Sequence, residues 1–217
     1  VVLWIFMDLL EAGCKHEETG VRWLKDRFFT SGAWKCQMPG TALLAGVLLG
    51  GCSFWNGATV IGGLLILMGF AVFSDGKLDY LILAVVTVLL SEFQSKVFVN
   101  GSVVSPSIYW GFLAEDKSIA GVIAYLFEIS GIVFLGVFLL CFFLKRRERA
   151  AAVSMLFPVC FAFLFSLTPD IGVNHKYIMI AYGFLTIFGA AAVCRLWNRW
   201  HAAGKVLGLL LALCLTT

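Results

Sequence analysis

Long apolar runs separated by short polar stretches recur along the whole chain. The runs that reach or approach membrane-spanning length cover residues 58–73, 78–90, 118–144, 151–167 and 177–194. They lack the polar face of a helix on the surface of a soluble protein, and a helix needs about 20 apolar residues to cross the hydrocarbon core. We therefore predict an all-α polytopic transmembrane helical bundle of about five to seven membrane helices, with residues 1–217 forming one transmembrane domain.

The beginning of the chain departs from this pattern. Residues 11–38 form the longest polar stretch, in which Val21, Leu24 and Phe28 recur at roughly helical spacing. This pattern is typical of an amphipathic juxtamembrane helix lying on the membrane surface, although a solvated loop with scattered aromatic residues fits as well. Residues 41–51 are apolar but reach only ~16 Å as a helix, so we expect a short or re-entrant helix there.

Lysine and arginine are distributed unevenly between the predicted loops. If the spans alternate, eight basic residues fall on one side of the membrane, in the loops at 74–78, 145–150 and 195–205. The other side has only Lys117 and Lys176, in the loops at 100–118 and 168–176. Because basic loops stay in the cytoplasm, these last two loops are predicted to lie outside the cell, in a multi-pass protein of the plasma membrane.

Composition supports the same class of protein. Of the 217 residues, 61% are hydrophobic and 13% are charged, and this charged share is about half that of soluble domains. No basic stripe with interleaved aromatic residues indicates a nucleic-acid partner, so the lipid bilayer is the expected partner. The chain starts in one apolar run without an initiator methionine and stops in another; we expect it to be a piece of a longer protein.

The seven cysteines follow no metal-binding spacing. Cys14 and Cys36 flank a polar segment and would be able to pair if that segment lies outside the cell. The other five lie in or beside apolar runs, and we interpret them as small hydrophobic residues.

Charged residues within or beside the apolar runs are the first candidates for chemistry. Glu128 lies about nine residues into the run 118–144, where an ionised group costs roughly 2.5–3.5 kcal/mol unless it faces a partner or water. It is either a functional glutamate or half of a structural ion pair with Lys96 or Lys176. Glu92 is four residues before Lys96, so these two can also pair on one helix face.

The two predicted outer loops are expected to face each other and to form the site. Together they offer the polar residues Glu115, Asp116, Asp170, Asn174, His175 and Lys176. Lys176 and His175 would hold a phosphate by charge and hydrogen bonds. Each residue also has an ordinary alternative, since Asp170 suits a helix cap, Asn174 a turn and His175 a solvated interface. The sequence contains no nucleophile elbow, Walker loop, HExxH or CxxC motif, so catalytic residues stay unassigned.

Two segments carry a family resemblance. Residues 108–118, Ile-Tyr-Trp-Gly-Phe-Leu-Ala-Glu-Asp-Lys-Ser, precede a run that opens Ile-Ala-Gly-Val. They resemble the external loop before a late helix in bacterial multi-spanning proteins of the GT-C glycosyltransferase superfamily. Residues 168–176, which begin Thr-Pro-Asp and end Asn-His-Lys, are similar to a second loop of that superfamily, where an aromatic-rich P…DN-x-K pattern opens a helix. This chain departs from the pattern, because no aromatic residue lies between Pro169 and Asn174 and Val173 replaces the acid. The departure argues against a metal or acid role at that position.

The resemblance covers roughly residues 55–200 and implies transfer of a sugar from a polyprenyl-phosphate donor to a cell-envelope acceptor at the outer face. In that superfamily the catalytic carboxylate lies in the first external loop, which is expected upstream of this chain. By the same resemblance Asn174, His175 and Lys176 would contact the donor phosphate, while Glu115 and Asp116 would lie near the acceptor or a metal. A divalent metal ion is an option because carboxylates gather outside, but the sequence specifies no ligand set.

Two other classes of protein remain open. A transporter or flippase fits the interrupted, glycine-rich segment Thr41–Gly63, with Glu92, Lys96 and Glu128 as a relay. A non-catalytic membrane subunit is the other. An upstream external loop with an acidic pair would favour sugar transfer, whereas an inverted repeat of these segments would favour transport.

Overall fold

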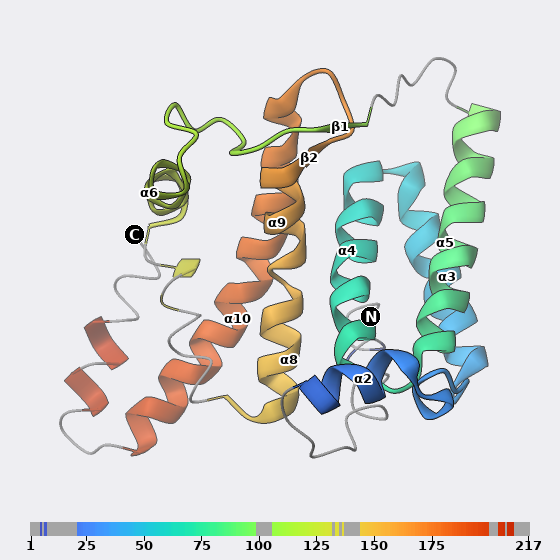
Figure 1. Cartoon of the computed structure of the whole chain (residues 1–217), viewed down its shortest axis with the longest axis horizontal. Helices are drawn as coiled ribbons and strands as arrows, with labels where there is room; N and C mark the ends of the chain where they lie inside the picture. Colours follow the sequence, from blue (N-terminus) through green and yellow to red (C-terminus); the bar gives the residue numbers. More distant parts are fainter. Residues whose placement is uncertain are drawn as a thin grey trace. The chain divides into compact units, whose positions relative to one another are not determined.

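The computed structural model of the chain is mostly helical (Figure 1). It describes residues 5, 7, 21–98, 106–131, 133, 134, 136, 144–199, 204–206 and 208–210. Contacts divide the chain into two compact units, a first unit of Val1–Val103 and a second unit of Val104–Thr217. Each unit is described by itself.

The first unit consists of helices joined by tight turns. Its elements are α2 (Val21–Phe29), η1 (Ser31–Ala33), α3 (Pro39–Gly51), η2 (Cys52–Phe54), α4 (Gly57–Phe73) and α5 (Lys77–Phe98). Pro39 opens α3, and the Asn56 side chain caps α4 by accepting a hydrogen bond from the Ala58 N–H at 3.0 Å. The predictions of a short helix at 41–51, a turn at 53–57 and a turn at Asp75-Gly76 are confirmed. The stretch 11–38 contains the helix α2, although residues 11–20 lie outside the described part.

Helices α3 and α5 pack closely because small residues line their contact. A Cβ atom added to Gly46 would lie 2.9 Å from the Leu83 carbonyl oxygen, and one added to Gly50 would lie 2.8 Å from the Leu90 Cβ. The Thr87 hydroxyl donates a hydrogen bond to the Gly46 carbonyl at 3.2 Å. This spacing of small residues, joined by a buried hydrogen bond, is the way in which helices associate inside membranes.

The outward faces of these helices are strongly apolar. Exposed side chains with a relative accessibility of 38–64% include Leu43, Leu44, Val47 and Leu48 on α3 and Leu81, Val85, Val88 and Leu89 on α5. Two helices among the described residues are long and apolar enough to cross a membrane, Lys77–Phe98 and Ile171–Asn198. Only 11% of the most apolar stretch of α5 is buried, so α5 does not resemble the core helix of a soluble protein.

The second unit contains a helical layer and one small sheet. Its described elements are β1 (Ser107–Ile108), α6 (Ile119–Ser130), α8 (Arg146–Ser154), α9 (Phe157–Leu164), β2 (Phe165–Ser166), η4 (Ile171–Asn174) and α10 (His175–Arg199). Helix α10 runs back along α9 and α8 (Figure 1). Buried Ala162, Ala181 and Leu185 fill the space between α9 and α10, and at the other end Arg195 of α10 binds the Glu148 carboxylate of α8 through two N–H groups.

Several predicted boundaries in the second unit are wrong. The run 118–144 was expected to be one helix, but α6 ends at Ser130 because Gly131 has a φ of +56°, which stops the helix and suits glycine. The run 151–167 is interrupted at Met155–Leu156, since Pro158 cannot continue the hydrogen bonds of α8 and instead opens α9.

Two basic segments predicted as loops are largely helical. Arg146–Arg149 belongs to the first turn of α8, and Arg195–Arg199 belongs to the end of α10. Lysine and arginine form helices readily, and the Lys145 N–H donates to the Glu148 carboxylate at 3.0 Å, which caps α8. Charged residues therefore ended the apolar runs in the sequence, but the helices α8 and α10 include these residues.

Candidate functional site

At one end of the second unit, the predicted outer loop at 100–118 pairs with the end of α9 and with β2. Strands β1 and β2 pair antiparallel, with Ser107 opposite Ser166. The pairing continues into the loop, where the Tyr109 N–H donates to the Leu164 carbonyl and the Gly111 N–H donates to the Phe163 carbonyl, both at 2.9 Å. Residues 163–166 belong to the predicted span 151–167, so the pairing joins the loop 100–118 to the end of that span. Contact between the loops 100–118 and 168–176 stays a prediction. We call residues 106–118 with residues 165–176 the paired-loop end.

The first of these loops is closed by its own side chains. The Lys117 ammonium donates to the Phe112 carbonyl at 2.8 Å and lies 4.9 Å from the centroid of the Tyr109 ring. The Trp110 indole N–H donates to the Lys117 carbonyl at 2.8 Å. Gly111 and Phe112 both have positive φ, at 85° and 46°, so the lysine stabilises a strained turn. The Lys117 side chain therefore stabilises the conformation of this loop.

Asp116 and Glu115 differ in what they contact. The Asp116 carboxylate accepts hydrogen bonds from the Ser118 hydroxyl at 2.6 Å and the Ser118 N–H at 2.8 Å, and both bonds lower the pKa of this carboxyl. Ser118 in turn caps α6 by accepting from the Gly121 N–H. Asp116 thus helps to begin α6, whereas the side chain of Glu115 is exposed.

Asp170 and Asn174 position the second loop. The Asp170 carboxylate accepts from the Gly172 N–H at 2.9 Å and caps η4, in agreement with its capping interpretation. Asn174 is only 2% exposed, and its amide donates to the Ala162 carbonyl at 3.0 Å and the Phe165 carbonyl at 2.6 Å. With both amide protons engaged, Asn174 ties the loop to α9 and β2.

His175 and Lys176 remain available at the start of α10, where both are exposed. The His175 Nδ1–H donates to the Gly172 carbonyl at 2.7 Å, which fixes the proton on Nδ1 and leaves Nε2 for another partner. Because η4 runs directly into α10, the His175 backbone N–H is already engaged with the Gly172 and Val173 carbonyls. The Lys176 ammonium at this position favours an anion, and His175 adds an N–H donor for it only when Nε2 also carries a proton.

The remaining candidates are not joined to these residues. Glu128 lies exposed in the last turn of α6, and among the described residues it forms no ion pair with Lys176. In the first unit Glu92 pairs with Lys96 at 3.7 Å as predicted, but both side chains are well exposed, so the pair is worth little. Within the described ranges no three His, Cys, Asp or Glu side chains are grouped to hold a metal ion.

A buried polar cluster in the first unit escaped sequence reasoning. Arg27 is 3% exposed and its guanidinium binds the Asp75 carboxylate at 2.6 Å. Asp79 is 1% exposed and accepts hydrogen bonds from the Cys36 thiol at 3.1 Å, the Gln37 N–H at 2.8 Å and the Met38 N–H at 3.1 Å. The available indication was that Lys77 and Asp79 open an apolar run, where charged groups are expensive.

The Cys36 side chain belongs to this cluster through its hydrogen bond to Asp79. The hydrogen bond to Asp79, together with desolvation, raises the pKa of the Cys36 thiol above its ordinary value. Cys36 is a free cysteine in the structure, and its suggested partner Cys14 lies outside the described residues.

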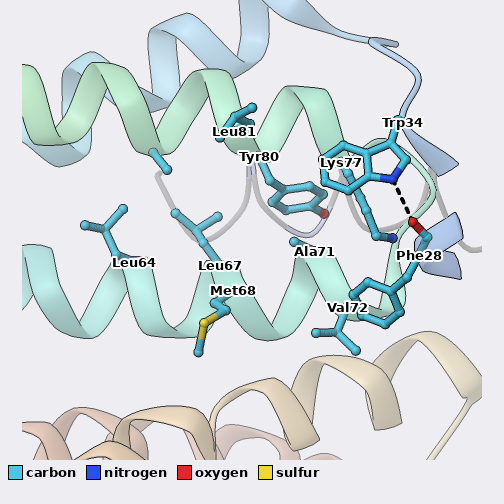
Figure 2. A pocket seen from close by; sticks show the side chains of 11 residues that line it. Phe28, Trp34, Leu64, Leu67, Met68, Ala71, Val72, Lys77, Tyr80 and Leu81 are labelled. Carbon is cyan, nitrogen blue, oxygen red and sulfur yellow. Dashed lines mark hydrogen bonds between the residues drawn. The ribbon is translucent and has the colours of Figure 1, made fainter. Parts of the chain in front are cut away.

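Beside the cluster, Lys77 lines an apolar pocket of about 400 Å³ between α4 and α5 (Figure 2). The Lys77 ammonium donates to the Ser74 carbonyl at 2.9 Å and lies 5.1 Å from the centroid of the Phe28 ring. Trp34 stands next to it, its indole N–H donating to the Phe28 carbonyl at 3.0 Å. The rest of the lining is almost wholly apolar, including Leu67, Met68 and Tyr80.

Comparisons with protein-family models, with curated proteins and with solved structures found no match to this chain.

Proposed function

We propose that this chain is part of a multi-pass plasma-membrane protein that transfers a sugar from a polyprenyl-phosphate donor to an envelope acceptor, in the manner of the GT-C glycosyltransferases it resembles. The paired-loop end carries the proposal. There the exposed His175 and Lys176 open α10, while Arg195 and the basic start of α8 lie at the opposite end of the same helices. Such an arrangement suits a bundle with its basic end in the cytoplasm and its paired loops outside.

The proposed chemistry at this end is phosphate binding. Lys176 supplies a positive charge, and His175 supplies a hydrogen bond from Nε2 when that nitrogen is protonated. Asp170 and Asn174 act on the ligand only by holding the loop in place. Glu115 is exposed beside Asp116, whose carboxylate is engaged with Ser118, and we assign Glu115 to the acceptor side. The general base would come from a part of the protein outside this chain.

The phosphate role is tested by measuring binding of a short-chain polyprenyl phosphate to the protein in lipid nanodiscs. Lys176→Ala and His175→Ala are each expected to weaken binding about tenfold, because hydrogen bonds to a charged group contribute roughly 1.5–3 kcal/mol. Lys205→Ala removes another exposed lysine and should leave binding unchanged. Equal affinity of Lys176→Ala and the unchanged protein would contradict the proposed site.

A transporter or flippase is the second candidate. The observation in its favour is that apolar helices are interrupted in both units, between α3 and α4 at η2 and between α8 and α9 at Met155–Leu156. Broken helices of this kind form substrate sites in secondary transporters. Reconstituted vesicles decide between the two: movement of a polyprenyl phosphate between leaflets without sugar transfer would favour the transporter, and neither activity would favour a non-catalytic subunit.

A further inference from the structure

We propose that the pocket between α4 and α5 binds a long-chain carboxylate, with the Lys77 ammonium as the counterion of the acidic head and the apolar lining around the first part of the chain. This proposal concerns the first unit and does not depend on the function proposed for the paired-loop end. It starts from a buried ammonium, that of Lys77, which forms no ion pair among the described residues.

Lys77 is only 5% exposed, yet no carboxylate among the described residues lies within ion-pair distance of its ammonium. The two acids nearest in sequence are engaged elsewhere, Asp75 with Arg27 and Asp79 with the thiol and two backbone N–H groups of residues 36–38. An ammonium has three N–H donors. One donates to the Ser74 carbonyl and the Phe28 ring lies over the charge, which leaves capacity for one further acceptor.

The pocket beside this ammonium is shaped for an apolar chain. Its volume of about 400 Å³ lies in the range of small-molecule sites, and its walls are the aliphatic and aromatic side chains of α4 and α5. Figure 2 shows Leu64, Leu67 and Met68 following one another along α4, away from the end that holds Lys77 and Trp34. Met68 and Leu81 at the rim are 53% and 51% exposed, so a chain is able to enter from the side.

The charges favour a carboxylate over a phosphate head. A phosphate carries more acceptor oxygens, and proteins that bind one usually supply several donors from arginine, lysine or a helix N-terminus. In this pocket the lining provides a single ammonium. A monoanion with two oxygens neutralises Lys77 without leaving further acceptors in an apolar environment, where unpaired polar groups are penalised.

Fluorescence quenching of Trp34 tests the proposal on the whole protein in nanodiscs. The probe is a stearate with a nitroxide close to its carboxyl end, since a nitroxide bound in the pocket would lie beside the indole. We expect saturable quenching that unlabelled stearate reverses and that Trp34→Phe largely removes. The methyl ester of the same probe, which has no charge, should bind about tenfold more weakly or worse, a loss of roughly 1.4 kcal/mol.

Lys77→Met should weaken binding of the labelled stearate as much as esterification of the probe does. Lys96→Met removes an exposed lysine from the same helix and serves as the matched control. If Lys77→Met fails to fold, the comparison of acid with ester on the unchanged protein still decides. Equal binding of acid and ester, or no saturable quenching, would overturn the proposal. Tighter competition by octadecyl phosphate than by stearate would overturn the choice of head group.

Discussion

The two units place their charged side chains in opposite ways. In the buried polar cluster of the first unit and beside it, Arg27, Lys77 and Asp79 are at most 5% exposed. Asp79 accepts three hydrogen bonds from residues 36–38. At the paired-loop end of the second unit, His175 and Lys176 are exposed. Burying a charge is costly unless it is paired or hydrogen-bonded. Arg27 and Asp79 therefore depend on the partners that the fold gives them, whereas His175 and Lys176 stay accessible to solvent.

The largest test of this contrast compares two aspartates. Asp79→Ala removes a buried carboxylate together with its three hydrogen bonds and leaves the Gln37 and Met38 N–H groups without this acceptor, and we expect it to lower the free energy of unfolding by about 3–5 kcal/mol. Asp170→Ala removes an exposed cap from the second unit and should cost about 1 kcal/mol. Thermal unfolding in a mild detergent measures both. Equal losses for the two variants would mean that burial does not separate the units.

Glycine substitutions test the packing of the units. An alanine Cβ at Gly46 would approach the Leu83 carbonyl oxygen to 2.9 Å, and we expect Gly46→Ala to destabilise the protein by roughly 1–3 kcal/mol. At Gly183 in α10 nothing lies within 4 Å of such a Cβ. Gly183→Ala should therefore stabilise by up to about 1 kcal/mol, because alanine favours the helix. The two variants are expected to shift the unfolding temperature in opposite directions; shifts in the same direction would contradict close contact of α3 with α5.

Two threonines give a smaller comparison. Thr87 donates to the Gly46 carbonyl of a different helix and is fully buried, so Thr87→Val should lose roughly 0.6–1.7 kcal/mol, the range for hydrogen bonds between membrane helices. Thr186 donates within its own helix to Gly183 and is exposed. Thr186→Val should change the free energy of unfolding by less than about 0.5 kcal/mol. If Thr186→Val lowers the free energy of unfolding more than Thr87→Val does, the hydrogen bond between α3 and α5 contributes no more to stability than one within a helix.

The sequence predicted the features that depend on local composition. The mostly helical fold, the short helix near 41–51 and the turn at Asp75-Gly76 follow from apolar runs and turn residues, which act over a few positions. The strand pairing of Ile108 with Phe165 was not predicted, because residues 151–167 were interpreted as one span. Alternating spans place only the loops 100–118 and 168–176 on one side.

The partners of individual side chains could not be predicted. Asn174 was expected to contact a ligand, but its amide bonds to carbonyls nine and twelve residues away. The buried role of Asp79 was not predicted, because its hydrogen-bond partners lie some forty residues earlier in the chain. In both cases tertiary contacts decide the role, and neither spacing nor periodicity encodes such contacts. The end of α6 at Gly131 was not predicted, because the hydrophobicity of an apolar run does not indicate which glycine adopts a positive φ.

The smallest expected effect concerns the ion pair that joins α8 to α10. Hydrogen bonds from Arg195 hold the pKa of Glu148 below its ordinary value, and the Lys145 N–H acts in the same direction against the effect of burial. Because the folded-state pKa is depressed, this contribution is present above the unfolded pKa of about 4.3 and is lost as the pH falls through the folded value. Both side chains are partly exposed, at 34% and 25%, so we expect at most about 1 kcal/mol.

The measurement is the difference in unfolding free energy between the unchanged protein and Glu148→Gln, followed from neutral pH to about pH 3. We expect this difference to shrink as the pH falls. Glu92→Gln, which breaks the exposed pair of the first unit, should show almost no difference at any pH, because solvent screens both charges. A Glu148 difference that grows on acidification would have the wrong sign for a carboxylate stabilised in its charged form, and would indicate that Arg195 contributes to α10 through packing of its side chain alone.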